Sequence, residues 1–267
     1  MPRFEDYRGF RDDPERKKLH LDISAQLGRE RKQRVYRQME IGPGSWVLDV
    51  GCGVGVDTIP LAQIVGPTGK VVGIDIDEAS IAEARRRAEE AGVSAWTEHR
   101  VADAADMPFE DNTFDACHSE RVFMHLPNRD EVLDEMIRVT KPGGRIVVID
   151  PDGASISWDT EEVEIERKLM PMWNLLQENP FAGRESFRLF KQHGLEDVMV
   201  DIVPSCGHDL EMARYLAKID DMIEKGLELG FLTQEEVDRF NASSERAAAM
   251  GAFFVYYCMI TTIGRKP

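Results

Sequence analysis

Residues 47–55 read Val-Leu-Asp-Val-Gly-Cys-Gly-Val-Gly, an apolar segment that runs directly into a turn with glycine at alternate positions. Glycines in such a turn let the main chain pass close to a ligand and aim backbone amides toward it. The spacing differs from the G-x-G-x-x-G of dinucleotide loops and places the carboxylate of Asp49 at the end of the strand. A pyrophosphate would gain nothing from this charge. The stretch therefore predicts a strand-and-turn site for a ligand with a cationic group.

Around this turn, short apolar segments alternate with segments of helical spacing. Strands are expected at 46–50, 71–76, 99–102, 114–118, 145–149, 197–203 and 253–263, and helices at 57–65, 80–91, 129–140 and 184–193. Continuously apolar strands separated by helices are typical of a parallel sheet that is covered on both faces. We therefore predict an α/β, doubly wound, Rossmann-like fold with a seven-stranded, mostly parallel sheet and an antiparallel last strand.

Three segments do not follow this alternation. Residues 1–40 are rich in charge with apolar residues at helical spacings, 151–185 contain a helix at about 160–177, and 205–250 read as two helices divided at 230–233. Thr233 and Glu236 form a capping-box pattern before the second of these. We expect an N-terminal helical lid at 1–40 and a main domain at 41–267, whose insertions at 151–185 and 205–250 shape the substrate site. Met172 and Trp173 could line an apolar pocket or belong to a plain core.

Three later motifs follow the glycine turn in order. They are VVGIDI at 71–76, VADA at 101–104 before Met-Pro-Phe, and Phe-Asp with an apolar strand and a His-Leu pair at 114–126. Together with the turn they resemble the class I S-adenosylmethionine (SAM) dependent methyltransferases, in particular the small-molecule branch that includes the ubiquinone and menaquinone biosynthesis enzymes. The resemblance covers about residues 44–150.

The resemblance implies SAM as cofactor and S-adenosylhomocysteine (SAH) as product. It implies that Asp49 orients the amino end of SAM, Asp75 accepts hydrogen bonds from the ribose hydroxyls and Asp103 meets the adenine amine. Asp75 could instead cap the next helix, although Asp77 and Ser80 are better placed. The full set of expected cofactor contacts is Asp49, Gly51, Cys52, Gly53, Gly55, Asp75, Ile76, Asp103, Ala104, Ser119, Glu120 and Arg121.

Methyl transfer from a sulfonium is an in-line displacement that mainly requires alignment and exclusion of water. A general base is needed only where the acceptor is protonated. Because open α/β sheets bind ligands at the carboxyl ends of their strands, we consider His208, His118 and Asp152 as catalytic candidates. Each has a structural alternative: His118 could be a hydrogen-bonded strand residue, and Asp152 could belong to a turn.

Composition narrows the function further. The formal charge is −16 over 267 residues, without a segregated basic face, which disfavours nucleic acid as a partner. No apolar run approaches a membrane span, so we expect no stable membrane insertion and a cytoplasmic location.

The four cysteines lie far apart, without metal-ligand spacing, and are expected to be small buried thiols, with no metal site. A homodimer through the inserted helices is compatible with the sequence.

The sequence thus predicts an enzyme that methylates oxygen, nitrogen or carbon of a small, partly apolar molecule. A protein that keeps the SAM fold for another purpose, as a cyclase or a regulatory SAM-binding module, would show the same motifs. A nicotinamide oxidoreductase is disfavoured by Asp49. The acidic charge disfavours an RNA methyltransferase, and no Asn-Pro-Pro-Tyr type motif is present.

Overall fold

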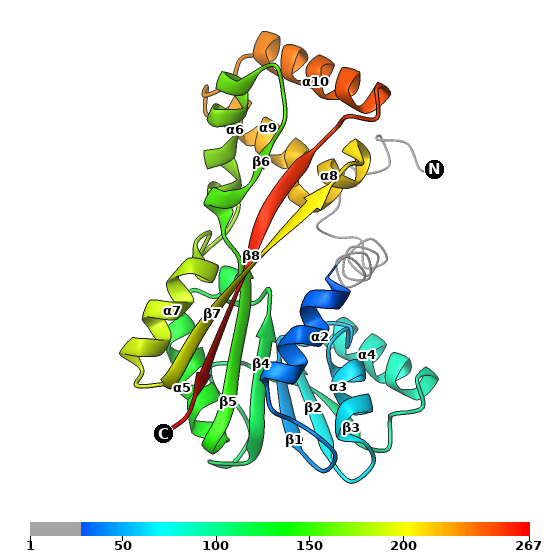
Figure 1. The fold of residues 1–267 in the computed structure, drawn as a ribbon, viewed down its shortest axis with the longest axis vertical. Coiled ribbons are helices and arrows are strands. Elements are labelled where there is room, and N and C mark those ends of the chain that lie inside the picture. The colour runs from blue at the N-terminus through cyan, green and yellow to red at the C-terminus, as the bar shows by residue number, and fades with distance from the viewer. Residues whose placement is uncertain (1–27) are drawn as a thin grey trace.

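The computed structural model describes residues 28–267, in which a mixed sheet carries helices on both faces and a helical lobe stands above it (Figure 1). The strands are β1 (Trp46–Val50), β2 (Lys70–Asp75), β3 (Thr97–Val101), β4 (Phe114–Glu120), β5 (Thr140–Pro151), β6 (Ser157–Trp158), β7 (Glu196–Gly207) and β8 (Val255–Arg265). The helices are α2 (Arg29–Gln38), α3 (Thr58–Val65), α4 (Glu78–Glu90), α5 (Arg129–Val139), α6 (Val163–Leu175), α7 (Ala182–Gln192), α8 (Leu210–Ala217), α9 (Ile219–Glu228) and α10 (Gln234–Ala249), with short 3-10 turns η3 (Phe123–His125) and η4 (Gly153–Ser155).

The sheet has the order β3-β2-β1-β4-β5-β8-β6, and β7 pairs with the same β8. The pairs among β1 to β5 are parallel, whereas β8 is antiparallel to β5, β6 and β7. The predicted α/β class and antiparallel last strand are confirmed. The eighth strand is β6, a two-residue strand inside the first insertion. Because β2 and β4 lie on opposite sides of β1, the carboxyl ends of β1 and β4 form the switch point where such sheets bind ligands.

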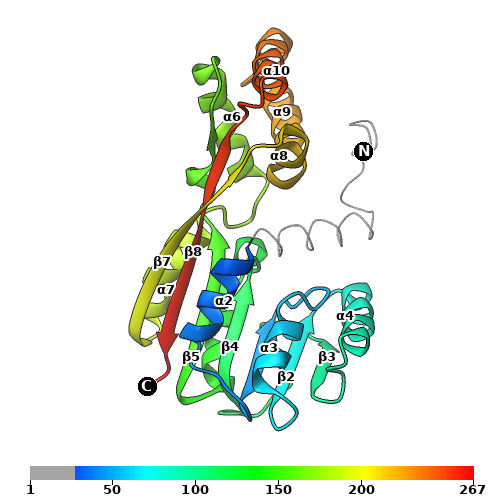
Figure 2. The same cartoon turned by 45° about the vertical axis from the view of Figure 1, so that its right-hand side comes forward.

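Two apolar clusters hold the layers together. Helices α2, α3 and α4 pack on one face, where Val35 and Leu61 meet the strand residues Val47 and Val147. In Figure 2, α2 and α3 lie in front of the sheet. Helices α5 and α7 cover the other face, and that cluster continues without a break into the lobe. Apolar residues on alternate faces of each buried strand therefore fix which helices lie on which side.

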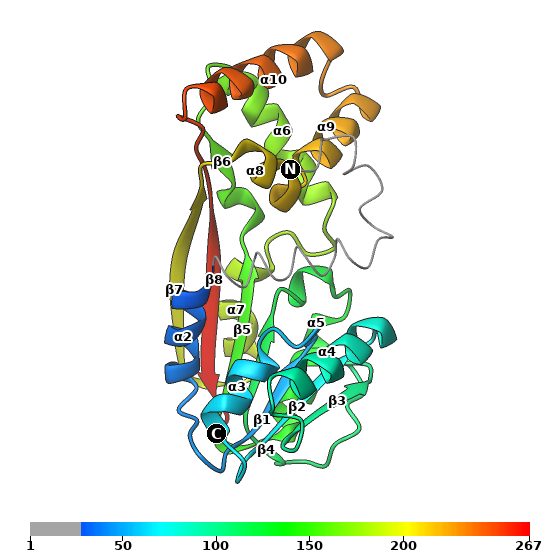
Figure 3. The ribbon, with the colours of Figure 1, turned by 90° about the vertical axis from the view of Figure 1, so that its right-hand side faces the viewer.

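The lobe is built on the far ends of β7 and β8, which continue beyond β5 (Figure 3). Its core contains Trp158 and Phe240, whose ring centroids are 5.2 Å apart, together with the buried side chains of Met172 and Trp173. This burial favours the core alternative for Met172 and Trp173. Among residues 28–267 no helix combines the length and apolar character needed to cross a lipid bilayer.

Two expectations need correction. Residues 205–250 form three helices instead of two, because Lys218 adopts the left-handed conformation (φ 55°) and separates α8 from α9. The capping box of Thr233 and Glu236 is present at the start of α10, as expected. All four cysteines are free, but only Cys52 and Cys117 are buried. Cys206 is exposed and Cys258 is half-buried, so the expected burial does not hold for these two. Residues 1–27 of the expected N-terminal lid, which include Tyr7 and Phe10, lie outside the described residues.

Candidate active site

The glycine turn after β1 is closely packed against the segment that follows β4. Gly51, Gly53 and Gly55 have positive φ angles of 70°, 51° and 81°. A Cβ atom on Gly51 would lie 2.3 Å from Cγ2 of Val122, which leaves no room for any side chain. The turn and the residues after β4 therefore form one surface at the switch point.

Asp49 pairs with His118 across β1 and β4, where the two residues lie directly opposite each other. Asp49 Oδ1 and His118 Nδ1 are 2.9 Å apart, and both side chains are buried. Burial alone would lower the pKa of His118, but the hydrogen bond to Asp49 and the charge of nearby Asp57 outweigh it and raise that pKa. Asp49 Oδ2 and His118 Nε2 are buried without a hydrogen-bond partner. Such orphaned polar atoms call for a partner such as a bound ligand.

The predicted ribose site lies at the end of β2. Asp75 accepts hydrogen bonds from the backbone N–H of Gly53 (2.8 Å) and of Asp77 (2.9 Å). The cap of α4 is Asp77, whose carboxylate accepts from Ala79 N–H and the Ser80 hydroxyl, so Asp75 does not have the capping role considered above. Carboxylate oxygens can accept further bonds, which leaves Asp75 able to take ribose hydroxyls.

The predicted adenine site is adjacent, because Asp75 pairs with Val101 at the end of β3. Asp103 is exposed and its carboxylate accepts the N–H of Ala105 (2.9 Å), with Ala104 between them. Ile76 is 76% exposed. The exposed Ile76 side chain, together with the carboxylates of Asp75 and Asp103, is a suitable surface for an aromatic base with polar edges.

At the end of β4, the three residues expected to contact the cofactor differ in the contacts that their side chains and main chains already make. Ser119 is buried with an unpartnered hydroxyl. Arg121 has a positive φ of 61°, and its N–H donates to Ile149 O at 2.7 Å. The Glu120 carboxylate accepts hydrogen bonds from Arg31 at 3.1 and 2.5 Å, so only its main chain is available to a cofactor. Non-glycine residues with positive φ are often associated with functional sites.

A buried ionic cluster, formed by Arg31, Lys32, Tyr36, Asp57 and Glu120, connects α2 to this surface. Lys32 Nζ lies 2.8 and 2.7 Å from the two carboxylate oxygens of Asp57 and 2.9 Å from Glu120 Oε2. The Tyr36 hydroxyl donates to Asp57 Oδ1 at 2.5 Å. Burial opposes these charges, yet Lys32 and Arg31 hold the pKa of Glu120 below its usual range, and Asp57 and Glu120 raise the pKa of Lys32.

Two residues of this cluster, together with His118, form the one group among residues 28–267 whose ligand atoms could hold a metal ion. Ligand atoms of Asp57, His118 and Glu120 lie within 4.8 Å of one another. The ammonium group of Lys32 already neutralises both carboxylates at hydrogen-bond distance. The Lys32 ammonium group therefore accounts for the proximity of the Asp57 and Glu120 carboxylates.

The residues present fit SAM, because the turn excludes side chains and a buried carboxylate oxygen beside it lacks a partner. Asp49, the glycine turn and the main chain of 119–121 would hold the methionine end, Asp75 the ribose and the Asp103 loop the adenine.

The three catalytic candidates are not brought together. His118 is fully buried beneath α2 with Tyr36 against its ring, which weighs against access to an acceptor. Asp152 is buried in an ion pair with Arg184 (2.5 Å). The catalytic roles of both stay predictions.

His208 lies far from the turn. His208 follows Gly207, which pairs with Val255 at the start of β8. Glu120 pairs with Ile149 of β5, which in turn pairs with Thr261, six residues further along β8. Six residues of strand correspond to about 20 Å. The His208 ring packs against Phe254, and its Nδ1 donates to Phe253 O at 3.3 Å. A role as base stays a prediction that requires the lobe and sheet to approach each other.

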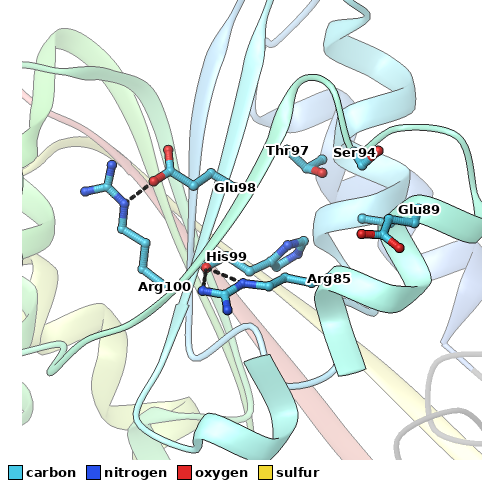
Figure 4. A pocket seen from close by; sticks show the side chains of 8 residues that line it. Arg85, Glu89, Ser94, Thr97, Glu98, His99 and Arg100 are labelled. Atoms are coloured by element: carbon cyan, nitrogen blue, oxygen red, sulfur yellow. Dashed lines mark hydrogen bonds and ion pairs between the residues drawn. The ribbon is translucent and has the colours of Figure 1, made fainter. Parts of the chain in front are cut away.

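A cavity of about 330 Å³ lies between α4 and β3 (Figure 4). Its lining includes Ser94 and Thr97 at the amino end of β3, away from the carboxyl ends of the strands. Arg85 donates to His99 O, and Arg100 pairs with Glu98. Arg85, Glu98 and Arg100 of this cavity thus have partners within the protein.

Sequence reasoning missed Arg31, Lys32 and Asp57. A signal was available for the first two, because they share a helical face with the apolar residues Val35 and Met39. Basic residues on the apolar face of a helix indicate buried partners. The identity of those partners cannot be read from the sequence, because they lie 25 and 89 residues away.

Comparisons with known proteins identify the family of the chain. Residues 41–205 match the family model of a methyltransferase domain. An uncharacterised transposon protein of Streptomyces fradiae is 31% identical over 73% of this chain, methyltransferase GfsG of Streptomyces halstedii is 35% identical over 49%, and a demethylmenaquinone methyltransferase of Bacillus cereus is 33% identical over 67%. The chain spans 56%, 46% and 81% of these proteins, respectively.

Solved structures show the same fold. A proposed methyltransferase of Bacillus halodurans superimposes with a TM-score of 0.64 at 20% identity, covering 88% of this chain and 98% of the other. The [4+2]-cyclase SpnF superimposes with a TM-score of 0.56 at 22% identity, covering 89% of this chain and 81% of the other.

Proposed function

We propose a small, partly apolar molecule as the methyl acceptor of this chain, which belongs to the class I SAM-dependent methyltransferases. The observation that carries the proposal is the glycine turn beside buried Asp49, at the switch point beneath a helical lobe with an apolar core. The relative from Bacillus cereus is named for an apolar acceptor, demethylmenaquinone. The charge of −16 supports a small molecule over nucleic acid.

When bound, SAM would supply an electrophilic methyl group on a sulfonium. Oxygen, nitrogen or carbon of the acceptor would form a bond to that methyl in line with the breaking bond to sulfur, and SAH would be the leaving group. Asp75 and the Asp103 loop anchor the nucleoside, and the turn with residues 119–121 orients the methionine end, so that alignment lowers the barrier. The lobe and α2 limit the access of water to this end of the sheet. Asp152 or His208 would accept a proton where the acceptor carries one.

The test is turnover with methyl-labelled SAM and a panel of quinols, phenols, amines and isoprenoids. Formation of SAH in step with a labelled product supports methyl transfer, and the product identifies the atom that is methylated. SAM binding without SAH formation across the panel would favour the second candidate, a SAM-fold protein with another activity. The structural similarity to SpnF, which is named as a cyclase, supports including that candidate.

A further inference from the structure

The loop after the glycine turn and the end of β4 are joined by a side chain that belongs to neither. Asp57 precedes α3, directly after the turn, and Glu120 is the last residue of β4. Lys32 on α2 contacts both carboxylates, at 2.7 and 2.9 Å. The side chains of Lys32, Asp57 and Glu120 are no more than 10% exposed.

The Asp57 carboxylate binds side chains of α2 and does not cap its own helix. Asp57 occupies the N-cap position of α3, yet its side chain makes no capping hydrogen bond. It instead receives Lys32 Nζ and the Tyr36 hydroxyl. Two buried carboxylates close to each other repel strongly unless a cation lies between them. The position of the turn relative to β4 therefore depends on α2.

The charges of α2 also affect Asp49, at the end of β1. Arg31 and Lys32 bring two positive charges to Asp49, Asp57 and Glu120, and His118 lies between Asp49 and the other two acids. Protonation of His118 would make these buried groups neutral as a set. The methionine end of SAM would lie beside this balanced set, on the two segments that Lys32 links.

We propose that Lys32 is a positioning residue for cofactor binding: its ammonium group links Asp57 after the glycine turn to Glu120 at the end of β4, and so couples the docking of α2 to formation of the SAM site. Lys32 itself does not touch the cofactor. The inference rests on SAM binding at the turn, which is therefore measured first.

The experiment is calorimetric titration of SAH into the wild-type chain, Lys32→Met and Arg34→Met. Arg34 is a matched control, because it lies on the same helix and pairs with Asp201 on β7 at 2.9 Å, away from the turn. We expect Lys32→Met to weaken SAH binding at least tenfold per folded molecule, and Arg34→Met to bind within about twofold of wild type. Unchanged affinity in Lys32→Met, or an equal loss in both variants, would overturn the proposal. Failure of the wild-type chain to bind SAH would instead refute the cofactor assignment itself.

A second variant covers the case in which Lys32→Met does not fold. Lys32→Met/Glu120→Gln removes one charge of each sign and keeps the cluster balanced, but the link is lost. We expect it to fold and to bind SAH at least tenfold more weakly than wild type, and wild-type affinity would overturn the proposal.

Hydrogen exchange of the wild-type chain provides a readout that requires no variant. Addition of SAH should slow amide exchange in α2 together with residues 51–57. Slower exchange at the turn with no change in α2 would show that the two are uncoupled and would contradict the proposal.

Discussion

Ion pairs are buried at the carboxyl end of the sheet, where we place the cofactor site, and exposed in the helical lobe. In the ionic cluster under α2, Arg31 and Glu120 are 6% and 8% exposed, whereas in the lobe Arg246 and Glu161 are 56% and 74% exposed. Buried pairs are costly to break, and exposed pairs contribute little. The difference indicates that buried ion pairs fix the positions of the segments at the carboxyl end of the sheet. The lobe is held together by its apolar core, and its surface charges can vary.

The largest effect is expected at the turn. Gly51→Ala would place a methyl group 2.3 Å from Val122 with φ at 70°, so the turn must move. We expect SAH affinity to fall by about 1,000-fold, or about 4 kcal/mol. Gly92→Ala is the matched control, because φ is 69° there but nothing lies within 4 Å of the added atom. It should cost about 1 kcal/mol in urea unfolding and leave SAH titrations unchanged. Equal losses of affinity in both variants would contradict the packing argument.

The next effect tests the lobe. Phe240 is 2% exposed and packs on Trp158, so Phe240→Ala should lower the free energy of unfolding by about 3 kcal/mol. Because the turn lies in the other region, the folded variant should keep SAH affinity within about twofold. Phe231→Ala, at a side chain that is 57% exposed, is the control and should change stability by less than about 0.5 kcal/mol. Loss of SAH binding in Phe240→Ala would show that the regions are not separable.

A pH effect is expected at the boundary between the regions. Burial raises the pKa of Asp150 to about 8, although the N–H of Met124 opposes this at 3.2 Å. The unfolded chain releases this proton near pH 4 and the folded chain near pH 8, so folding takes up a proton in between and stability falls as pH rises. Asp150→Asn removes this dependence. Its stability relative to wild type in urea should increase by up to about 1.4 kcal/mol per pH unit from pH 5 to 8. A constant difference would contradict the raised pKa.

The smallest effect is expected on the lobe surface. Arg246→Gln breaks the exposed pair with Glu161 and should change the midpoint of thermal unfolding by no more than the equivalent of about 0.5 kcal/mol. A loss comparable with that of Phe240→Ala would remove the contrast between the two regions.

The sequence predicts best the elements whose signals are local. Strand β1 has the predicted bounds 46–50, because an apolar run meets glycine directly. Strand β5 spans Thr140–Pro151 instead of 145–149, since pairing with β4 and β8 extends it through residues without a strand pattern. Nothing in the sequence marks the left-handed Lys218 that divides α8 from α9.

The candidate site shows the same limit. Asp49, Asp75 and Asp103 were found from motifs and lie at adjacent strand ends. The links from Lys32 to Asp57 and Glu120 join separate segments and depend on how α2 packs. A residue whose role is set by tertiary contacts carries no local signal beyond an unexpected charge on an apolar face.

The most direct test of the central claim is a crystal structure of the chain with SAH. We expect density for the homocysteine end between residues 51–55 and 119–122, with both ribose hydroxyls on Asp75. Density in the cavity between α4 and β3, with the turn empty, would contradict the account.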